Sequence, residues 1–140
     1  MLSNHDIQGP TEVEVYVDGA SRGNPGPAGI GVVLKFDSKR ICLKKFIGNK
    51  TNNEAEYLAL LEGLKLAIKI NAKKVRIFSD SELIIKQLKG EFSVKEIRLS
   101  KLYSEVKGLE SLLDVEYSYI SRESNKLADE LANEAIDESR

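Results

Sequence analysis

Residues 12–36 read EVEVYVDGASRGNPGPAGIGVVLKF. From Glu12 to Val17, polar or aromatic residues alternate with valines, which is the two-residue period of a β-strand with one buried face. Asp18 follows this run, and the glycines and prolines between Gly19 and Gly29 predict turn structure. A second β-rich run extends over residues 30–36. The stretch therefore predicts two strands, with an acid where the first one ends.

The pattern after this stretch extends the sheet and then changes period. Residues 41–47 form a third β-rich run, and the polar link 37–40 predicts a hairpin between it and the second run. Thr51 and Glu54 then form a capping box, with the Thr at the helix cap and the Glu three residues later. Apolar residues recur at helical spacing after the box, so we predict a helix that ends near Asn71.

The second half of the chain alternates between strand and helix periods. Strands are predicted at 75–78 and 115–120, and helices at 83–88, 97–112 and 125–136. Three consecutive strands followed by this alternation predict an α/β domain in which helices pack on one mixed sheet. A length of 140 residues suits a single core. We expect residues 1–10 to form a flexible tail and residues 11–140 to form the single domain.

Composition excludes several classes of protein. The single cysteine, Cys42, rules out an intrachain disulfide, and with His5 as the only histidine a zinc site built from Cys and His would lack ligands. Cys42 lies in an apolar strand and is expected to be buried. No apolar run approaches the roughly 20 residues that span a bilayer, and residues 1–10 lack the apolar segment of a secretory signal. We expect a soluble, cytoplasmic protein with no membrane partner.

Charge is unevenly distributed along the chain, although the net charge is only −1. Residues 35–107 carry 17 Lys and Arg against nine Asp and Glu, and both flanking segments are acidic. A basic middle can contact phosphates while acids elsewhere hold a metal ion. The alternative is that these lysines only form a solvated surface.

Several carboxylates lie where the predicted elements meet. Asp18 follows the first strand, Asp80 follows the fourth, and Asp129 lies in the last helix. If the first and fourth strands are parallel neighbours, Asp18 and Asp80 meet at one sheet edge, where ligands gather in open sheets. The helix that carries Glu54 and Glu56 could close over this edge. The two glutamates flank its apolar stripe equally, at about 100° per residue. Because the capping box already uses Glu54, Glu56 is favoured at the site.

Clustered carboxylates repel one another and need cations to stay ionised together. Mg²⁺ or Mn²⁺ fits best, since both are hard ions that prefer oxygen ligands. Two such ions about 4 Å apart can hold the attacking water and the leaving oxygen of a phosphodiester. The pattern therefore indicates metal-assisted hydrolysis without a His, Ser or Cys nucleophile. Structural interpretations stand beside this one: an Asx turn at Asp18, a helix cap at Asp80 and an exposed helix position at Asp129.

Four segments, in this order along the chain, resemble type 1 ribonuclease H. They are YVDGASRGNPGPAGIGVVL from Tyr16, TNNEAEYLALLEGL from Thr51, IFSDSELIIKQL from Ile77 and RESNKLADELAN from Arg122. The resemblance covers nearly the whole chain and implies a five-stranded mixed sheet flanked by helices, three antiparallel strands followed by two parallel ones. It implies an endonuclease that hydrolyses the RNA strand of RNA–DNA hybrids to 3′-hydroxyl and 5′-phosphate ends. Mg²⁺ or Mn²⁺ is the implied cofactor, with two ions beside bound substrate.

The resemblance also assigns the chemistry to particular residues. The catalytic, metal-binding quartet of the family falls on Asp18, Glu56, Asp80 and Asp129. Glu56, and not Glu54, occupies the matching position and is expected to touch a 2′-hydroxyl, the group that distinguishes RNA from DNA.

Residues that contact nucleic acid in the family are matched at further positions. Asn24, Asn52 and Asn53 match residues that contact the RNA strand, and Thr51 matches one that helps to hold a DNA-strand phosphate. Arg122 resembles the Arg of an Arg-Glu pair in short, archaeal-type members and is expected to contact phosphate. The alternatives are that Thr51 serves as a cap, with or without that contact, and that Arg122 pairs with the next residue on the surface.

The chain departs from longer relatives in two places. Its loop 120–125 has no histidine, where many bacterial relatives carry one, and this bears on turnover more than on the type of reaction. Residues 89–101 hold four basic residues and no Trp, where longer relatives place a basic protrusion. We therefore expect weaker and more salt-sensitive substrate binding.

Two other functions would suit the same fold. One is a related nuclease that also cuts double-stranded RNA, and the other is a non-catalytic nucleic-acid binder. The intact quartet counts against the binder, which has no need to keep mutually repelling acids together. No obligatory protein partner is inferred.

Overall fold

The computed structural model describes residues 9–139, so most of the expected flexible tail lies outside the described residues. Five strands form one sheet in the order β3-β2-β1-β4-β5. The strands are β1 (Glu12–Ser21), β2 (Gly26–Phe36), β3 (Lys39–Lys50), β4 (Lys74–Ser79) and β5 (Asp114–Tyr119). β2 pairs antiparallel with β1 and with β3, whereas β4 pairs in parallel with both β1 and β5. The five-stranded mixed sheet predicted from the sequence is confirmed.

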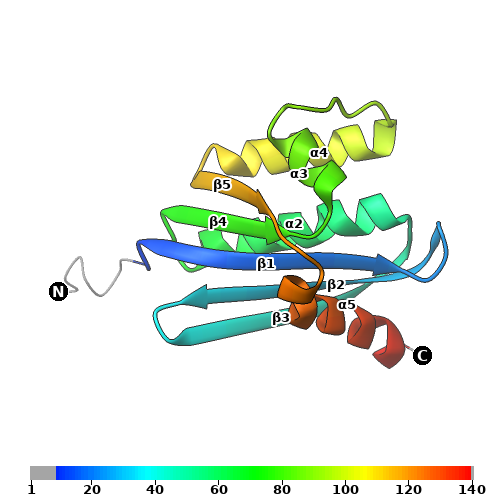
Figure 1. The fold of residues 1–140 in the computed structure, drawn as a ribbon, viewed down its shortest axis with the longest axis horizontal. Coiled ribbons are helices and arrows are strands. Elements are labelled where there is room, and N and C mark those ends of the chain that lie inside the picture. Colours follow the sequence, from blue (N-terminus) through cyan, green and yellow to red (C-terminus); the bar gives the residue numbers. More distant parts are fainter. Residues whose placement is uncertain (1–8, 140) are drawn as a thin grey trace.

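Helices cover both faces of this sheet (Figure 1). They are α2 (Asn52–Lys69), α3 (Glu82–Leu88), α4 (Ile97–Glu110) and α5 (Lys126–Glu138), and a 3₁₀ turn, η1 (Glu123–Asn125), precedes α5. α2 packs on β1 and β2 and also contacts α4, whereas α5 crosses the opposite face of the sheet over β1, β2 and β3. Within residues 9–139, no helix has the length and apolar character needed to cross a membrane.

The alternation of β1 has the predicted consequence for the core. Val13, Val15 and Val17 are buried in the core that α2 covers, and the residues between them point to the other face. α2 begins as the capping box predicts. The hydroxyl of Thr51 accepts from the Glu54 backbone N–H, and the Glu54 carboxylate accepts from the Thr51 backbone N–H at 3.0 Å. These contacts fix where α2 starts above the sheet.

The predicted turn between Gly19 and Gly29 is shorter than expected, because β1 and β2 continue through most of it. Gly29 and, just beyond the stretch, Gly31 instead serve the packing of α5. A Cβ on Gly29 would lie 2.4 Å from the carbonyl oxygen of Ala132, and one on Gly31 would lie 2.1 Å from that of Ala128. Only residues without a side chain let the helix backbone approach the strand this closely.

Gly31→Ala is therefore expected to lower the free energy of unfolding by about 1–3 kcal/mol, because the added methyl group forces α5 away from β2. Gly108→Ala is the matched control. A Cβ at Gly108, in α4, meets nothing within 4 Å, and Ala favours a helix over Gly by about 1 kcal/mol. Urea denaturation of both variants measures the difference. Equal effects on stability would contradict the close packing of α5 on β2.

The prediction that Cys42 is buried is wrong, because its side chain is exposed. β3 is an edge strand of the sheet. Ile41 and Leu43 pack against the core, and Cys42 between them points to the opposite face, where solvent reaches it. An apolar run on an edge strand thus has one buried and one exposed face.

Candidate active site

The parallel pairing of β1 with β4 brings two aspartates to the same edge of the sheet. Tyr16 lies opposite Phe78 in the register, and Asp18 and Asp80 follow two residues later on their own chains. Asp80 comes directly after β4, as predicted. Asp18 lies inside β1 and pairs with Gly31, so the prediction that β1 ends at Asp18 and the Asx-turn interpretation are both wrong. β1 continues because β2 pairs with it beyond this point.

Glu56 reaches the two aspartates because α2 crosses β1 in close contact. A Cβ on Gly19 would lie 2.3 Å from the carbonyl carbon of Ala55, so only glycine permits this approach. The backbone N–H of Gly19 donates to Oε1 of Glu56 at 2.8 Å. Glu54 is turned toward the N-terminus of α2, where it completes the capping box. The geometry thus agrees with the preference for Glu56 over Glu54.

Asp18, Glu56 and Asp80, hereafter the acidic cluster, lie together although they come from β1, α2 and the link after β4. Each offers one carboxylate oxygen, and these oxygens all lie within 4.8 Å of one another. Asp129, from α5, lines the same cleft of about 400 Å³ and contacts Asp18, but it stands outside this compact group. The structure therefore brings all four predicted carboxylates to one cleft, with three of them in closest proximity.

Burial and like charge act together on the acidic cluster. Burial raises the pKa of Asp18, and the neighbouring charges of Glu56 and Asp80 raise it further. Burial also raises the pKa of Glu56, although hydrogen bonds from its neighbours, including the Gly19 N–H, oppose this. At Asp80 burial raises the pKa, and the guanidinium of Arg122 opposes the shift. Without a cation the cluster therefore retains protons that ordinary carboxyls would lose, and a metal ion would displace them.

The metal-free protein is accordingly expected to lose stability as the pH rises. A carboxyl whose pKa is raised on folding stabilises the protein fully below its unfolded pKa of about 4, and this contribution disappears as the pH rises through the folded value. In chelator, the Tm should therefore fall between about pH 5 and pH 8, and excess Mg²⁺ should reduce the fall by binding the ionised cluster. Thermal unfolding followed by circular dichroism measures both. Asp18→Asn should show a smaller fall, and a wild-type Tm that rises equally with and without Mg²⁺ would contradict the account.

Polar side chains surround the acidic cluster. Asn52, Asn53 and Arg122 line its cleft. The amide oxygen of Asn24 accepts from the backbone N–H of Asn52 at 3.0 Å, which ties the β1–β2 turn to the start of α2. Thr51 caps α2 beside them. The five residues that the sequence indicated as nucleic-acid contacts thus lie in or next to one cleft.

Comparison with known proteins identifies the family of this chain. Residues 16–135 match the family model described as Reverse transcriptase-like. The chain is 31% identical to the Ribonuclease H of Legionella pneumophila, in an alignment that covers 91% of this chain and 98% of that protein. The chain belongs to the ribonuclease H family.

Further members of the ribonuclease H family resemble the chain more closely in sequence. It is 41% identical to the Bifunctional protein Rv2228c of Mycobacterium tuberculosis over 90% of this chain, but it spans only 36% of that longer protein. Among solved structures, the crystal structure of LC11-RNase H1 in complex with an RNA/DNA hybrid superposes with a TM-score of 0.85. The two are 38% identical, over 91% of this chain and 98% of that one.

The side chain of Arg122 lies beside that of Asp80. The Nε of Arg122 is 4.0 Å from a carboxylate oxygen of Asp80, and the Arg122 side chain is 86% exposed. This places the guanidinium over the cleft and favours a role there over a surface pair with Glu123. The helix-cap interpretation of Asp80 is wrong, because Ser81 caps α3 and accepts from the backbone N–H of Ile84.

Two buried polar residues of this site were not predicted from the sequence. The hydroxyl of Ser79 reaches Glu56. Asn125 is 1% exposed, and its Nδ2 donates to the carbonyl oxygen of Val17 at 2.8 Å while its side chain also contacts Asp80. The one available signal was position, since each residue adjoins the end of a predicted element.

Proposed function

We propose that this chain is a metal-dependent endonuclease that hydrolyses the RNA strand of RNA–DNA hybrids to 3′-hydroxyl and 5′-phosphate ends. The acidic cluster carries the proposal, because three segments distant in sequence contribute carboxylate oxygens that lie within 4.8 Å of one another. Membership of the ribonuclease H family supports it. So does the likeness to an RNase H1 whose crystal structure contains an RNA/DNA hybrid.

The donor set of the cleft fits a hard divalent cation. All of its acidic ligands are carboxylate oxygens, which suit Mg²⁺ or Mn²⁺. Asp18, Glu56 and Asp80 would hold one ion, and Asp129 with Asp18 would help to hold a second beside bound substrate. Such ions, when bound, lower the pKa of a water molecule and neutralise charge that develops around phosphorus. The raised pKa values of Asp18 and Glu56 support this assignment, because they arise first from burial and then from neighbouring carboxylates, and a bound cation would offset both effects.

The side chains around the cluster would orient the substrate. In the proposed reaction a water oxygen bonds to phosphorus, the bond from phosphorus to O3′ breaks, and O3′ ends with a proton. Asn52 and Asn53 offer amide groups to the RNA strand, where the 2′-hydroxyl can both donate and accept. The carboxylate of Glu56 would accept from the same hydroxyl. Arg122, exposed over the cleft, would contact a phosphate.

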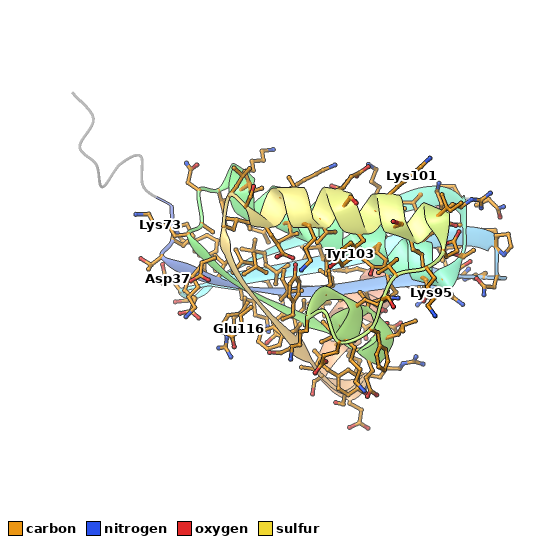
Figure 2. All side chains as sticks on the ribbon, turned by 90° about the horizontal axis from the view of Figure 1, so that it is seen from above. Asp37, Lys73, Lys95, Lys101, Tyr103 and Glu116 are labelled. Carbon is orange, nitrogen blue, oxygen red and sulfur yellow. The ribbon has the colours of Figure 1, made fainter. Side chains whose placement is uncertain are left out.

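Cations near the start of α4 supply a second contact with the duplex. Lys95 and Lys101 lie at the end of the molecule opposite to Lys73 and Asp37 (Figure 2). Lys101 and Arg98 line a shallow cleft between α4 and the start of α2. These few side chains would bind phosphates of the hybrid by charge alone, which agrees with the expectation of salt-sensitive binding.

The test is a cleavage assay with three end-labelled duplexes: an RNA–DNA hybrid, an RNA duplex and a DNA duplex. Each is incubated with Mg²⁺, with Mn²⁺ or with chelator. We expect internal cuts in the RNA strand of the hybrid with either metal and none with chelator. Cleavage of the RNA duplex at a similar rate would broaden the substrate to double-stranded RNA. Cleavage in chelator, or binding without cleavage under every metal condition, would overturn the proposal.

Arg122→Ala should weaken hybrid binding without abolishing catalysis, because the metal ligands remain. Loss of one phosphate contact reduces the slope of log Kd against log salt concentration by about one. Kd values measured at several salt concentrations, with Ca²⁺ in place of Mg²⁺ to limit cleavage, give that slope. Glu123→Ala, in the neighbouring residue, is the control and should leave the slope unchanged. Identical slopes for Arg122→Ala and the wild type would remove Arg122 from the interface.

A further inference from the structure

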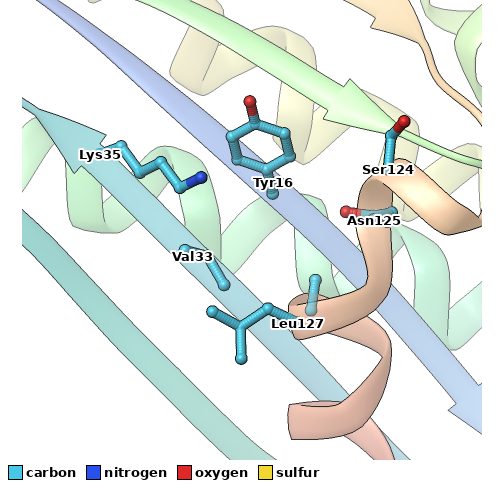
Figure 3. A pocket seen from close by; sticks show the side chains of 7 residues that line it. Tyr16, Val33, Lys35, Ser124, Asn125 and Leu127 are labelled. Atoms are coloured by element: carbon cyan, nitrogen blue, oxygen red, sulfur yellow. The ribbon is translucent and has the colours of Figure 1, made fainter.

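A separate cavity, of about 90 Å³, lies on the face of the sheet that α5 covers and shares no lining residue with the cleft of the acidic cluster. It lies where η1 and the start of α5 cross β1 and β2 (Figure 3). Tyr16 and Leu127 lie on opposite sides of it, and Val33 lies between them on β2. Lys35 lies at one end and Asn125 at the other. The cavity thus has an aromatic wall, an aliphatic wall and two polar ends.

The polar end at Asn125 requires a hydrogen-bond donor. Nδ2 of Asn125 donates to the Val17 carbonyl oxygen at 2.8 Å, which fixes the orientation of the amide. Its Oδ1 is buried and has no hydrogen-bond partner among residues 9–139. The amide oxygen points into the cavity, toward the space between Tyr16 and Leu127 (Figure 3). An unsatisfied buried acceptor costs about 1–3 kcal/mol, so a ligand with an N–H or O–H group would be favoured there.

The aromatic wall and the lysine restrict what such a ligand can be. Tyr16 stacks on Phe78 with ring centroids 4.8 Å apart and an interplanar angle of 19°, which holds the ring in place. On the other face of the ring lies the ammonium of Lys35, whose Nζ is 4.8 Å from the ring centroid. A flat ring could replace this contact by stacking on Tyr16. The displaced ammonium would then favour an anionic group at the open end of the cavity.

We propose that this cavity binds a nucleotide. An amino group of the base donates to Oδ1 of Asn125, the base lies against Tyr16, and Lys35 contacts the phosphate. A cavity of about 90 Å³ accommodates only the edge of one base, so the sugar and phosphate remain at its open end. Free nucleotides and the ends of oligonucleotides share this chemistry.

Titration of ¹⁵N-labelled protein with adenosine 5′-monophosphate, in chelator, tests the proposal by NMR. We expect shifts at the backbone amides of Val33 and Leu127 and at the side-chain amide of Asn125, with a Kd of about 1 mM or tighter. Ribose 5-phosphate, which lacks the base, should leave these signals unchanged. A 5′-phosphorylated trinucleotide that binds more tightly than the mononucleotide at the same signals would identify an oligonucleotide end as the ligand, and weaker binding would identify a free nucleotide.

Lys35→Ala should weaken binding of adenosine 5′-monophosphate by about fivefold, the effect of one exposed charge pair. Lys39→Ala is the matched control, because Lys39 lies over the Phe36 ring near the same hairpin turn but outside the cavity. It should bind as the wild type does. The proposal is overturned if the cavity signals do not shift, if ribose 5-phosphate shifts them equally, or if the two lysine variants behave alike.

Discussion

Asp80→Asn is expected to reduce the rate of hybrid cleavage at least about a thousandfold. Metal ions contribute several kcal/mol of charge stabilisation to hydrolysis of this kind, and each 1.4 kcal/mol corresponds to about a factor of ten in rate. Asp80 offers one of the three clustered oxygens, and an amide there removes both a negative charge and a strong ligand. The measurement is the single-turnover rate on a labelled hybrid in Mg²⁺.

A measurement of Tm distinguishes this loss of catalysis from a loss of folding. In chelator, Asp80→Asn should have a Tm at or above that of the wild type, because it removes a largely buried carboxylate from a repelling group. Asp114→Asn is the control, since Asp114 is an exposed residue at the start of β5. It should cleave at the wild-type rate. An Asp80→Asn variant that retains a tenth or more of the wild-type rate would remove Asp80 from the assigned site.

Glu56→Gln and Glu54→Gln are expected to differ in activity at least about a hundredfold. Metal ions contribute several kcal/mol of transition-state stabilisation, and the loss of about 2.7 kcal/mol of it slows the reaction about a hundredfold. Glu56 belongs to the acidic cluster, whereas Glu54 caps α2. Gln preserves the capping box, so Glu54→Gln should keep both stability and activity. The same substitution two residues apart on one helix thus tests which carboxylate serves the chemistry.

The readouts for this pair are the single-turnover rate and the affinity for Mn²⁺ by calorimetry. Glu56→Gln should lose both, and Glu54→Gln should lose neither. The reversed result, or equal loss in the two variants, would mean that the capping assignment of Glu54 and the metal assignment of Glu56 are mistaken.

Structural features were predicted best from the sequence where a single physical cause produces the residue pattern. The valines of β1 alternate because one face packs under α2, and the Thr51–Glu54 box appears because the first N–H groups of a helix need acceptors. The proximity of Asp18 and Asp80 could be predicted from the amino-acid sequence, because parallel neighbours end at the same edge of a sheet. This prediction required β1 and β4 to be parallel neighbours, and the structure shows that they are.

Structural features were predicted poorly where one residue type can serve two structural purposes. Glycine marks turns, but Gly29 and Gly31 are there because the backbone of α5 lies directly on β2, and no local pattern reveals that contact. Asn125 gave no signal beyond its position at the start of a predicted helix, since a single polar residue has no spacing to recognise. Cys42 was misplaced because an apolar strand at a sheet edge exposes one of its faces.

Anomalous diffraction from a crystal soaked in Mn²⁺ tests the central claim most directly. We predict a peak about 2.1 Å from carboxylate oxygens of Asp18, Glu56 and Asp80, the usual distance for a small hard cation bound by oxygen. The peak should vanish in Asp80→Asn crystals soaked in the same way. A wild-type crystal with no peak between these three carboxylates at saturating Mn²⁺ would contradict the account.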